Sequence, residues 1–134
     1  MMTIRWLREQ MRQGKSIFDL PLRVTFYARV STEKVEQQGS LENQIQYYTE
    51  FIRKNPNWTY IPGYIDEGIS GTSTYKRDSF LRMIADAQRG MFDFIITKEI
   101  SRFSRNTLDS IQYTQELLEN NVGVLFQNDN INTL

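Results

Sequence analysis

The sequence contains no cysteine and no histidine among its 134 residues. The absence of cysteine excludes disulfide bonds, thiolate nucleophiles and cysteine-ligated zinc. The absence of histidine excludes imidazole bases and the commonest metal ligand in proteins. Any catalysis must therefore use serine, tyrosine, lysine, arginine or carboxylate side chains, and we expect no cofactor and no metal.

Long apolar runs are also missing. No stretch approaches the roughly 18 apolar residues of a membrane span, and Arg5, Arg8, Glu9 and Arg12 interrupt the N-terminus where a signal peptide would be apolar. We therefore expect a cytoplasmic protein without membrane contact. The content of 40% apolar and 24% charged residues is typical of one globular domain.

The chain has no overall excess of either charge. Residues 1–23 carry five basic and two acidic side chains, whereas the rest carries eleven basic and fourteen acidic ones. Such a surface does not indicate broad nucleic-acid binding. If the protein acts on DNA, it must do so through a local basic cluster or with help from another domain.

Apolar and polar residues alternate from Val24 to Val30, which predicts a β-strand. Because strand side chains repeat every two residues, Tyr27, Arg29 and Ser31 share one face and converge at the carboxyl end of this strand. Ligands bind at that end of open α/β sheets, and a guanidinium beside a hydroxyl indicates a site for an anion such as phosphate. The same residues also fit a half-exposed edge strand with solvated polar side chains.

Hydrophobic periodicity predicts the other elements. Helices are expected over residues 3–13, 40–54, 78–90 and 107–120, and further strands over residues 58–65, 92–97 and 122–126. This alternation predicts an α/β fold with a central, mostly parallel sheet of four to five strands flanked by helices. In the first helix, Ile4, Leu7 and Met11 form an apolar stripe, which favours a packed N-terminal arm over a DNA-binding arm.

Local signals refine these elements. Ser40 is the expected cap of the second helix, Pro62 places the second strand at an edge or a bulge, and the apolar run 92–97 predicts a central strand. The third helix is expected to bury Phe80, Leu81, Ile84 and Ala85. The fourth helix is expected to bury Leu108, Ile111 and Leu118.

Two polar residues accompany the first two strands. Gln44 lies on the inner stripe of the second helix, where it either serves the site near Ser31 or only braces the loop that follows Ser31. Asp66 stands at the carboxyl end of the second strand. A long hydroxyl-rich loop follows Asp66 and ends in Lys76 and Arg77, a basic pair that can close over an anion.

A second basic cluster follows the strand at 92–97. Arg102 and Arg105 are three residues apart, so one helical turn would point both guanidiniums the same way. The planar fork of arginine fits phosphate oxygens in a bidentate manner, which indicates an anion site. The alternative is the exposed start of a surface helix.

These motifs, in this order and at this spacing, resemble the catalytic domain of serine recombinases, most closely the large members found in integrating phages and conjugative transposons. The resemblance covers about residues 23–134 and is carried by the following segments: Tyr27-Ala28-Arg29-Val30-Ser31-Thr32, Ser40-Leu41-x-x-Gln44, Asp66-x-x-x-Ser70-Gly71, Arg77 and Ser101-Arg102-Phe103-Ser104-Arg105-Asn106. It implies a resolvase-like three-layer fold. Residues 1–22 would then be an N-terminal extension, and a C-terminal dimer helix and DNA-binding region would lie beyond this chain.

The resemblance also implies roles for the site residues. Ser31 would attack a DNA phosphodiester and form a phosphoserine linkage, and strand exchange and rejoining would follow without ATP or metal. The scissile phosphate would be bound by Arg29, Arg102 and Arg105, with Arg77, Lys76, Gln44, Tyr27 and Asp66 in support. The partners would be double-stranded DNA and further copies of the protein, as a dimer and a synaptic tetramer.

The sequence departs from the family pattern at Ser101, where many small resolvases and invertases carry an aspartate. Any acid-base duty of that aspartate therefore does not transfer, and the proton acceptor for Ser31 stays open among Asp66, water and a neutral arginine network. Two other functions remain conceivable. One is a small phosphoesterase, although no glycine-rich phosphate loop or carboxylate metal pair is present, and the other is a non-catalytic DNA-binding or assembly domain of the same fold.

Overall fold

The computed structural model describes residues 3–31, 36–68, 77–98, 103 and 107–134; for residues 30, 31, 36–41, 68 and 107 it describes the backbone. Its helices are α1 (Ile4–Arg12), the short 3-10 helix η1 (Ile17–Asp19), α2 (Glu36–Arg53), α3 (Asp78–Gln88) and α4 (Thr107–Glu119). Its strands are β1 (Arg23–Ser31), β2 (Thr59–Tyr60), β3 (Tyr64–Gly68), β4 (Phe94–Thr97), β5 (Gly123–Phe126) and β6 (Ile131–Asn132). The alternation of strands and helices expected from the sequence is confirmed.

The strand β1 lies inside the sheet, whose order is β2-β1-β4-β5-β6. β1 pairs in parallel with β4 on one side and with both β2 and β3 on the other. β5 continues the sheet in parallel beside β4, and β6 closes it as an antiparallel partner of β5. The mostly parallel sheet is therefore confirmed, whereas the interpretation of residues 24–30 as an edge strand is wrong, because both flanks of β1 are paired.

The described residues form six strands, not four to five. The strand expected over residues 58–65 is divided into β2 and β3, because Pro62 has no N–H to donate to the ladder. The hydroxyl of Thr25 donates to the carbonyl of Pro62 across this break, at 3.1 Å. β6 is the other addition, and its two residues are too few to show a periodic pattern.

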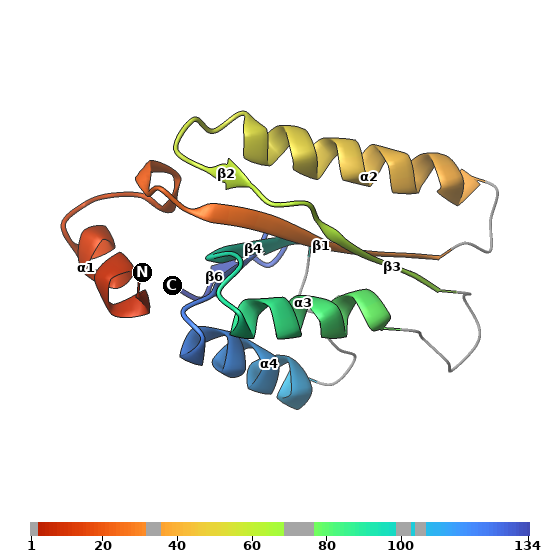
Figure 1. The fold of residues 1–134 in the computed structure, drawn as a ribbon. Helices are drawn as coiled ribbons and strands as arrows, with labels where there is room; N and C mark the ends of the chain where they lie inside the picture. The colour runs from red at the N-terminus through yellow and green to blue at the C-terminus, as the bar shows by residue number, and fades with distance from the viewer. Residues whose placement is uncertain (1–2, 32–35, 69–76, 99–102, 104–106) are drawn as a thin grey trace.

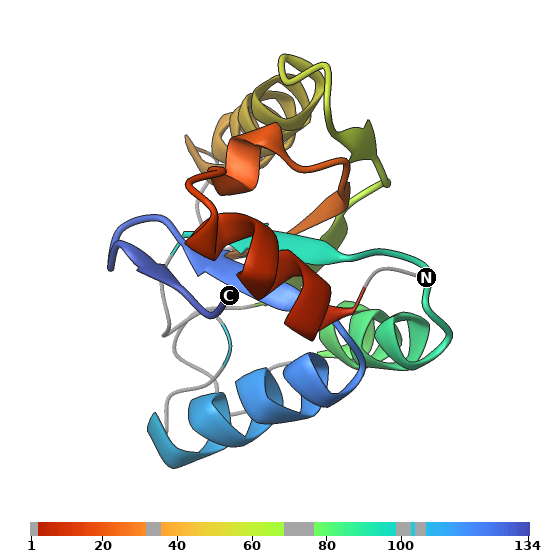
Figure 2. The same ribbon diagram turned by 90° about the vertical axis from the view of Figure 1, so that its left-hand side faces the viewer.

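The sheet lies between two layers of helices (Figures 1 and 2). α2 covers one face, and α3 and α4 cover the other, so the three-layer arrangement is confirmed. β1 contributes to both cores through its alternating side chains. Val24, Phe26 and Ala28 pack into the cluster that includes the inner residues of α2, whereas Tyr27 packs into the cluster below the sheet.

Three details of the helices differ from the expectation. α2 begins at Glu36, so Ser40 lies inside the helix and does not cap it. In α3, Leu81 is 56% exposed and Ala85 is half-buried, while Met83 and Ala87 are buried instead. In α4 the expected stripe is wrong in part, because Leu108 and Ile111 are exposed and the helix turns Ser110 and Leu117 inward. The third expected residue, Leu118, is half-buried against the core.

The N-terminal segment packs against the sheet as expected. Thr3 caps α1, which ends before Gly14, a residue with a φ of +98° that suits glycine. Ile4 and Leu7 are buried in the same cluster as Val24 and Phe26 of β1. Arg8 donates two hydrogen bonds, each 3.1 Å long, to the backbone carbonyls of residues 133 and 134, so α1 lies beside the C-terminal end of the described chain.

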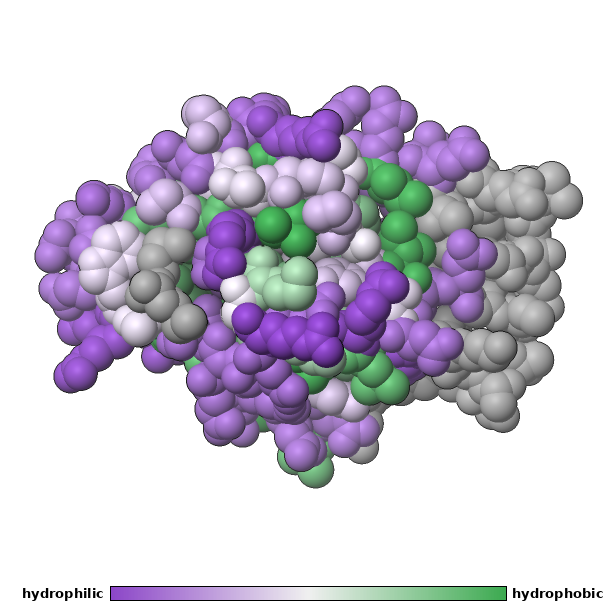
Figure 3. Space-filling view, in the orientation of Figure 1, coloured by the Kyte–Doolittle hydropathy of each residue, from purple (hydrophilic) through white to green (hydrophobic). Residues whose placement is uncertain are grey.

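Hydrophilic residues cover much of the face of the molecule seen in Figure 3, with apolar residues gathered between the upper and lower helical layers. None of the helices described is long and apolar enough to cross a membrane.

Candidate functional site

The carboxyl ends of the parallel strands meet at one edge of the sheet. β1 ends at Ser31, which is paired with Gly68 at the end of β3, and β4 ends nearby at Thr97. Figure 1 shows the ends of β1 and β3 extending together beyond β4. The backbone thus carries Ser31 to the place where open α/β sheets bind ligands.

Tyr27 and Asp66 form a buried pair beneath this edge. The Tyr27 hydroxyl donates to Asp66 Oδ2 at 2.7 Å, and the exposed fractions of the two residues are 0% and 4%. Burial raises the pKa of the Tyr27 phenol, and the hydrogen bond to Asp66 raises it further, while the positive charge of Arg77 acts in the opposite direction. Tyr27 is therefore a neutral donor, and its phenol does not lie exposed at the strand end.

The Asp66 carboxylate also caps α3. Its Oδ1 accepts from the backbone N–H of Ser79 at 2.9 Å, and its Oδ2 accepts from that of Phe80 at 3.0 Å. Arg77, the residue just before the helix, makes no side-chain cap, so Asp66 of β3 satisfies these first-turn donors. The negative charge beside the helix N-terminus is stabilised by the helix dipole as well. Asp66 thus joins β3, β1 and α3.

Arg77 connects α3 to the segment that follows β4. One of its terminal nitrogens, Nη2, donates to the backbone carbonyl of Phe103. Its guanidinium also lies over the ring of Phe80, with Cζ 3.9 Å from the ring centroid. In this structure Arg77 therefore contacts protein groups on two elements that border the site.

The structural role of Phe103 was not predicted from the sequence. Its side chain is fully buried, with its ring centroid 6.2 Å from that of Tyr27, 5.1 Å from that of Phe80 and 5.2 Å from that of Phe126. The available signal was a single apolar residue between the polar residues of Ser101-Arg102-Phe103-Ser104-Arg105. One such residue has no periodicity, so its burial could not be predicted.

Thr97 was expected in the strand over residues 92–97 but not as a residue near the site. It is fully buried at the end of β4, and its hydroxyl donates to the backbone carbonyl of Tyr27 at 2.9 Å. This bond joins the end of β4 to the middle of β1, four residues before Ser31.

The other expected site residues are placed as follows. Arg29 is half-buried on β1, paired in register with Asp66, and lies two residues beyond Tyr27 on the same face. Gln44 is half-buried on α2, the helix that covers the opposite face of β1, so the described residues do not bring it to the Tyr27–Asp66 pair. Lys76, Arg102 and Arg105 lie outside the described residues.

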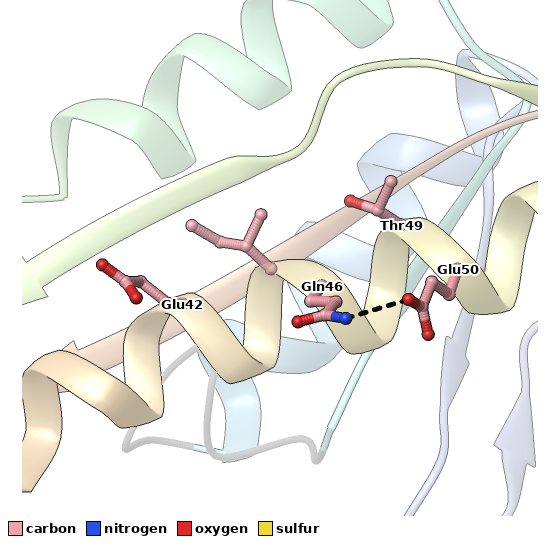
Figure 4. Close-up of a pocket in the computed structure, with 5 residues that line it drawn as sticks. Glu42, Gln46, Thr49 and Glu50 are labelled. Atoms are coloured by element: carbon pink, nitrogen blue, oxygen red, sulfur yellow. Dashed lines mark hydrogen bonds between the residues drawn. The ribbon is translucent and has the colours of Figure 1, made fainter.

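No group of three or more carboxylates that could hold a metal ion occurs among the described residues. A shallow hollow of about 420 Å³ does lie along α2, and Figure 4 shows four of its lining residues: Glu42, Gln46, Thr49 and Glu50. Gln46 donates to Glu50 at 3.0 Å. The two carboxylates disfavour a phosphate ligand there, so the edge at Ser31 remains the candidate site.

The chain matches the family model described as "Resolvase, N terminal domain" over residues 24–134. A putative DNA recombinase from Bacillus subtilis (strain 168) is 30% identical over 106 residues, which are 78% of this chain and 20% of that protein. The chain thus spans about a fifth of the length of this curated relative. The chain belongs to the resolvase family.

Solved structures agree with this assignment. The chain is similar to a resolvase family site-specific recombinase from Streptococcus pneumoniae, with a TM-score of 0.69 and 31% identity, over 84% of this chain and 76% of that one. It is also similar to the N-terminal catalytic domain of TP901-1 integrase, with a TM-score of 0.65 and 26% identity, over 83% and 81% of the chains. The C-terminal catalytic domain of ISC1926 TnpA, an IS607-like serine recombinase, shares the fold, with a TM-score of 0.62 and 19% identity, over 78% and 69%.

Proposed function

We propose that this chain is the catalytic domain of a site-specific DNA recombinase with Ser31 as its nucleophile. The observation that carries the proposal is the position of Ser31 at the end of the inner strand β1, paired with Gly68 and two residues beyond the register pair of Arg29 and Asp66, in a chain of the resolvase family. A serine there is held at the ligand-binding edge of the sheet by backbone pairing. A binding module would have no use for its hydroxyl.

The proposed reaction is a phosphoryl transfer. The Ser31 oxygen attacks the phosphorus of one DNA phosphodiester in line, a phosphoserine bond forms, and the bond to the 3′ oxygen breaks. The serine proton passes to a base, and the leaving 3′ oxygen gains a proton to become a hydroxyl. Because the phosphoserine ester keeps the bond energy, attack by a 3′ hydroxyl rejoins the exchanged strands without ATP.

Arginines would supply the electrostatic stabilisation. The transition state carries negative charge on its equatorial oxygens, and guanidiniums can stabilise that charge where other phosphoryl-transfer enzymes use a metal. Arg29 on β1 is the described candidate, and we assign the same role to Arg102 and Arg105. Lys76 would add a further positive charge, and Gln44 would support the segment after Ser31.

We assign Asp66 a positioning role and not that of the base for Ser31. Its two carboxylate oxygens already accept hydrogen bonds from Tyr27, Ser79 and Phe80. A proton taken up by Asp66 would compete with these three bonds and so weaken the cap on α3. Water or the arginine network then remains as the proton acceptor.

The wider assignment follows from the relatives. Similarity to the TP901-1 integrase domain supports a large serine recombinase that acts in DNA integration or in a transposon. Its partners would be double-stranded DNA and further copies of itself, as a dimer and a synaptic tetramer, in the cytoplasm. In this proposal residues 1–22 are an extension joined to the catalytic domain of residues 23–134, and site recognition resides in another region of the protein.

The test is covalent capture of DNA. The full-length protein that contains this chain is incubated with a junction duplex, a DNA that carries the sequence at one end of the chromosomal element that encodes it, and the products are run on a denaturing gel. Wild type and Ser16→Ala, a serine change at the cap of η1, should give a protein–DNA band, and Ser31→Ala should give none. Equal bands would move the nucleophile elsewhere, and no band despite tight binding would favour a regulatory or assembly domain.

A further inference from the structure

Phe103 separates the two arginines that follow β4. Its ring is enclosed by Tyr27 from β1, Phe80 from α3 and Phe126 from β5, at centroid distances of 5.1 to 6.2 Å. The three contacts are edge-to-face, with interplanar angles of 75° to 80°. Such an arrangement fixes the ring from three elements and adds specific geometry to the apolar burial.

The backbone of Phe103 is held from a different direction. Its carbonyl accepts from Arg77 Nη2, and the same guanidinium lies over the Phe80 ring, which touches the Phe103 ring as well. Arg77 therefore contacts the main chain of Phe103 directly, and it contacts the side chain of Phe103 indirectly, through the ring of Phe80. A residue fixed at both its ring and its carbonyl has little freedom to rotate.

Hydrogen bonds also hold the elements around Phe103 and Arg77 together. Asp66 binds the first turn of α3, which contains Phe80 and follows Arg77, and Tyr27 binds Asp66 from β1. This series of described contacts links the strand that ends at Ser31 to Phe103. In the sequence, Phe103 directly follows Arg102, one of the two arginines that the proposed function assigns to the phosphate.

We propose that Phe103 and Arg77 form one positioning unit, in which the buried ring and the carbonyl-bound guanidinium fix Phe103 relative to β1 and α3. This inference rests on the proposed function, because it assigns Arg102 and Arg105 to the phosphate. It changes the role of Arg77, whose guanidinium holds the Phe103 carbonyl and need not contact DNA. It also gives the apolar residue of the motif a task that the charge pattern alone does not suggest.

The unit explains how guanidiniums of like charge can be held near one phosphate. Arginines at neighbouring positions repel one another and would spread apart on an unsupported loop. An aromatic anchor between them in the sequence, held by packing at Phe103, would lower the entropy lost when the site is ordered around DNA. Displacement of such groups by about 1 Å can slow a reaction about 100-fold.

The test compares two buried phenylalanines of the same core cluster. Phe103→Leu and Phe103→Ala alter the anchor. The matched controls are Phe92→Leu and Phe92→Ala, because Phe92 is buried in the same cluster but lies just before β4, at the amino-terminal end of that strand. For each variant we would measure the maximal rate of covalent capture of the junction duplex, the DNA concentration at half-maximal rate, and the thermal midpoint. If an alanine variant does not fold, the leucine pair decides.

The expected result is a loss of rate that stability does not explain. Phe103→Leu should be about 10-fold slower and Phe103→Ala about 100-fold slower at saturating DNA, whereas the Phe92 variants keep the wild-type rate once folded. The half-maximal DNA concentration should match that of the controls. Equal rates in the two series would overturn the positioning role.

Hydrogen exchange provides a readout that needs no DNA. Phe103→Leu should speed amide exchange in the peptide covering residues 98–106, and Phe92→Leu should not. Equal exchange would reject the anchor even if catalysis fails for another reason. Conversely, a wild type without a Ser31-dependent band would reject the proposed function, while the exchange result would still decide on the anchor.

A double-variant experiment tests the link to Arg77. Arg77→Met removes the donor to the Phe103 carbonyl and keeps an apolar chain over Phe80. If the two residues act as one unit, Arg77→Met combined with Phe103→Leu should be slowed no more than about 2-fold beyond the slower single variant. Multiplicative losses would show that Arg77 acts separately, as a direct phosphate ligand would.

Discussion

The phenol of Tyr27 and the carboxylate of Asp66 share a buried 2.7 Å hydrogen bond between β1 and β3, the two strands that end at Ser31 and Gly68. The two residues are 39 positions apart in the chain and belong to β1 and β3, and Asp66 reaches further to the first turn of α3. One carboxylate therefore ties three elements together at the edge where the chemistry is proposed. The stability of the site depends on groups that need not touch DNA.

Asp66→Ala should destabilise the protein strongly. It leaves the Tyr27 hydroxyl and the N–H groups of Ser79 and Phe80 without their acceptor in a buried place, and we expect a loss of about 3 kcal/mol in the free energy of unfolding. Tyr27→Phe removes one donor and should cost about 1 kcal/mol. Urea denaturation of both variants checks this order, and a loss below that of Tyr27→Phe would contradict the capping role of Asp66.

Stability should fall at alkaline pH because two tyrosines are held neutral. Burial and a carboxylate partner raise the pKa of both Tyr27 and Tyr64, the latter bonded to Asp86 at 2.5 Å. Above a pH of about 10 the unfolded tyrosines lose their protons while the folded ones keep theirs, so the unfolded state binds fewer protons and stability declines as pH rises. Between pH 9 and 11, Tyr27→Phe and Tyr64→Phe should each show a shallower decline than wild type, and an unchanged slope would contradict this.

The strands were the most predictable part of the fold. β1 was predicted from its alternation of apolar and polar residues, and β4 from a nearly continuous apolar run. The alternation did not show that the second face of β1, with Thr25 and Tyr27, is fully buried as well. The inward face of α4 was not predictable in this way. Its buried positions are Ser110 and Leu117, while the apolar Leu108 and Ile111 face outward, so hydropathy indicated the wrong stripe.

The candidate site was predictable in its residue types and not in its connections. The shared face of Tyr27 and Arg29 follows from strand geometry. Asp66 was expected at the carboxyl end of a strand, whereas it lies inside β3, two residues before that strand ends. The cap that Asp66 forms on α3 depends on the packing of a distant helix, which no local pattern reports. The burial of Phe103 likewise depends on tertiary packing, since its three ring partners come from three different elements.

The N-terminal helix should be part of the folded core and not a detachable arm. Leu7 is fully buried in the cluster that contains the residues of β1, so Leu7→Ala should lower the free energy of unfolding by about 2 to 5 kcal/mol. Trp6 is the neighbouring control, because it is 42% exposed and its change to alanine should cost much less, about 0.5 kcal/mol. Thermal denaturation of the two variants tests this difference. Equally small losses of stability in both would show that α1 adds little to the core.

Substitution of Gly63 should destabilise the protein, because the ring of Phe26 occupies the space that a side chain at this position would need. A Cβ built at Gly63 would lie 2.3 Å from the ring of Phe26, which itself stacks on Tyr48. Gly63→Ala must displace that ring and should cost about 1 to 3 kcal/mol of stability. Combining it with Phe26→Leu should give a smaller total loss than the sum of the two single changes, and simple additivity in denaturant titrations would contradict the close contact.

Arg102→Ala should slow DNA cleavage far more than it weakens DNA binding. A guanidinium that stabilises the extra charge of the transition state contributes about 2.7 to 4 kcal/mol, which corresponds to a rate about 100- to 1000-fold lower. Arg89→Ala is a matched control, because Arg89 follows α3 on the exposed surface and makes a long 3.8 Å ion pair with Asp86. Single-turnover capture of the junction duplex measures the rate, and filter binding to the same duplex measures affinity. Near-normal capture by Arg102→Ala would reject its assigned role, whereas equal losses of rate in both variants would point to a general effect of surface charge.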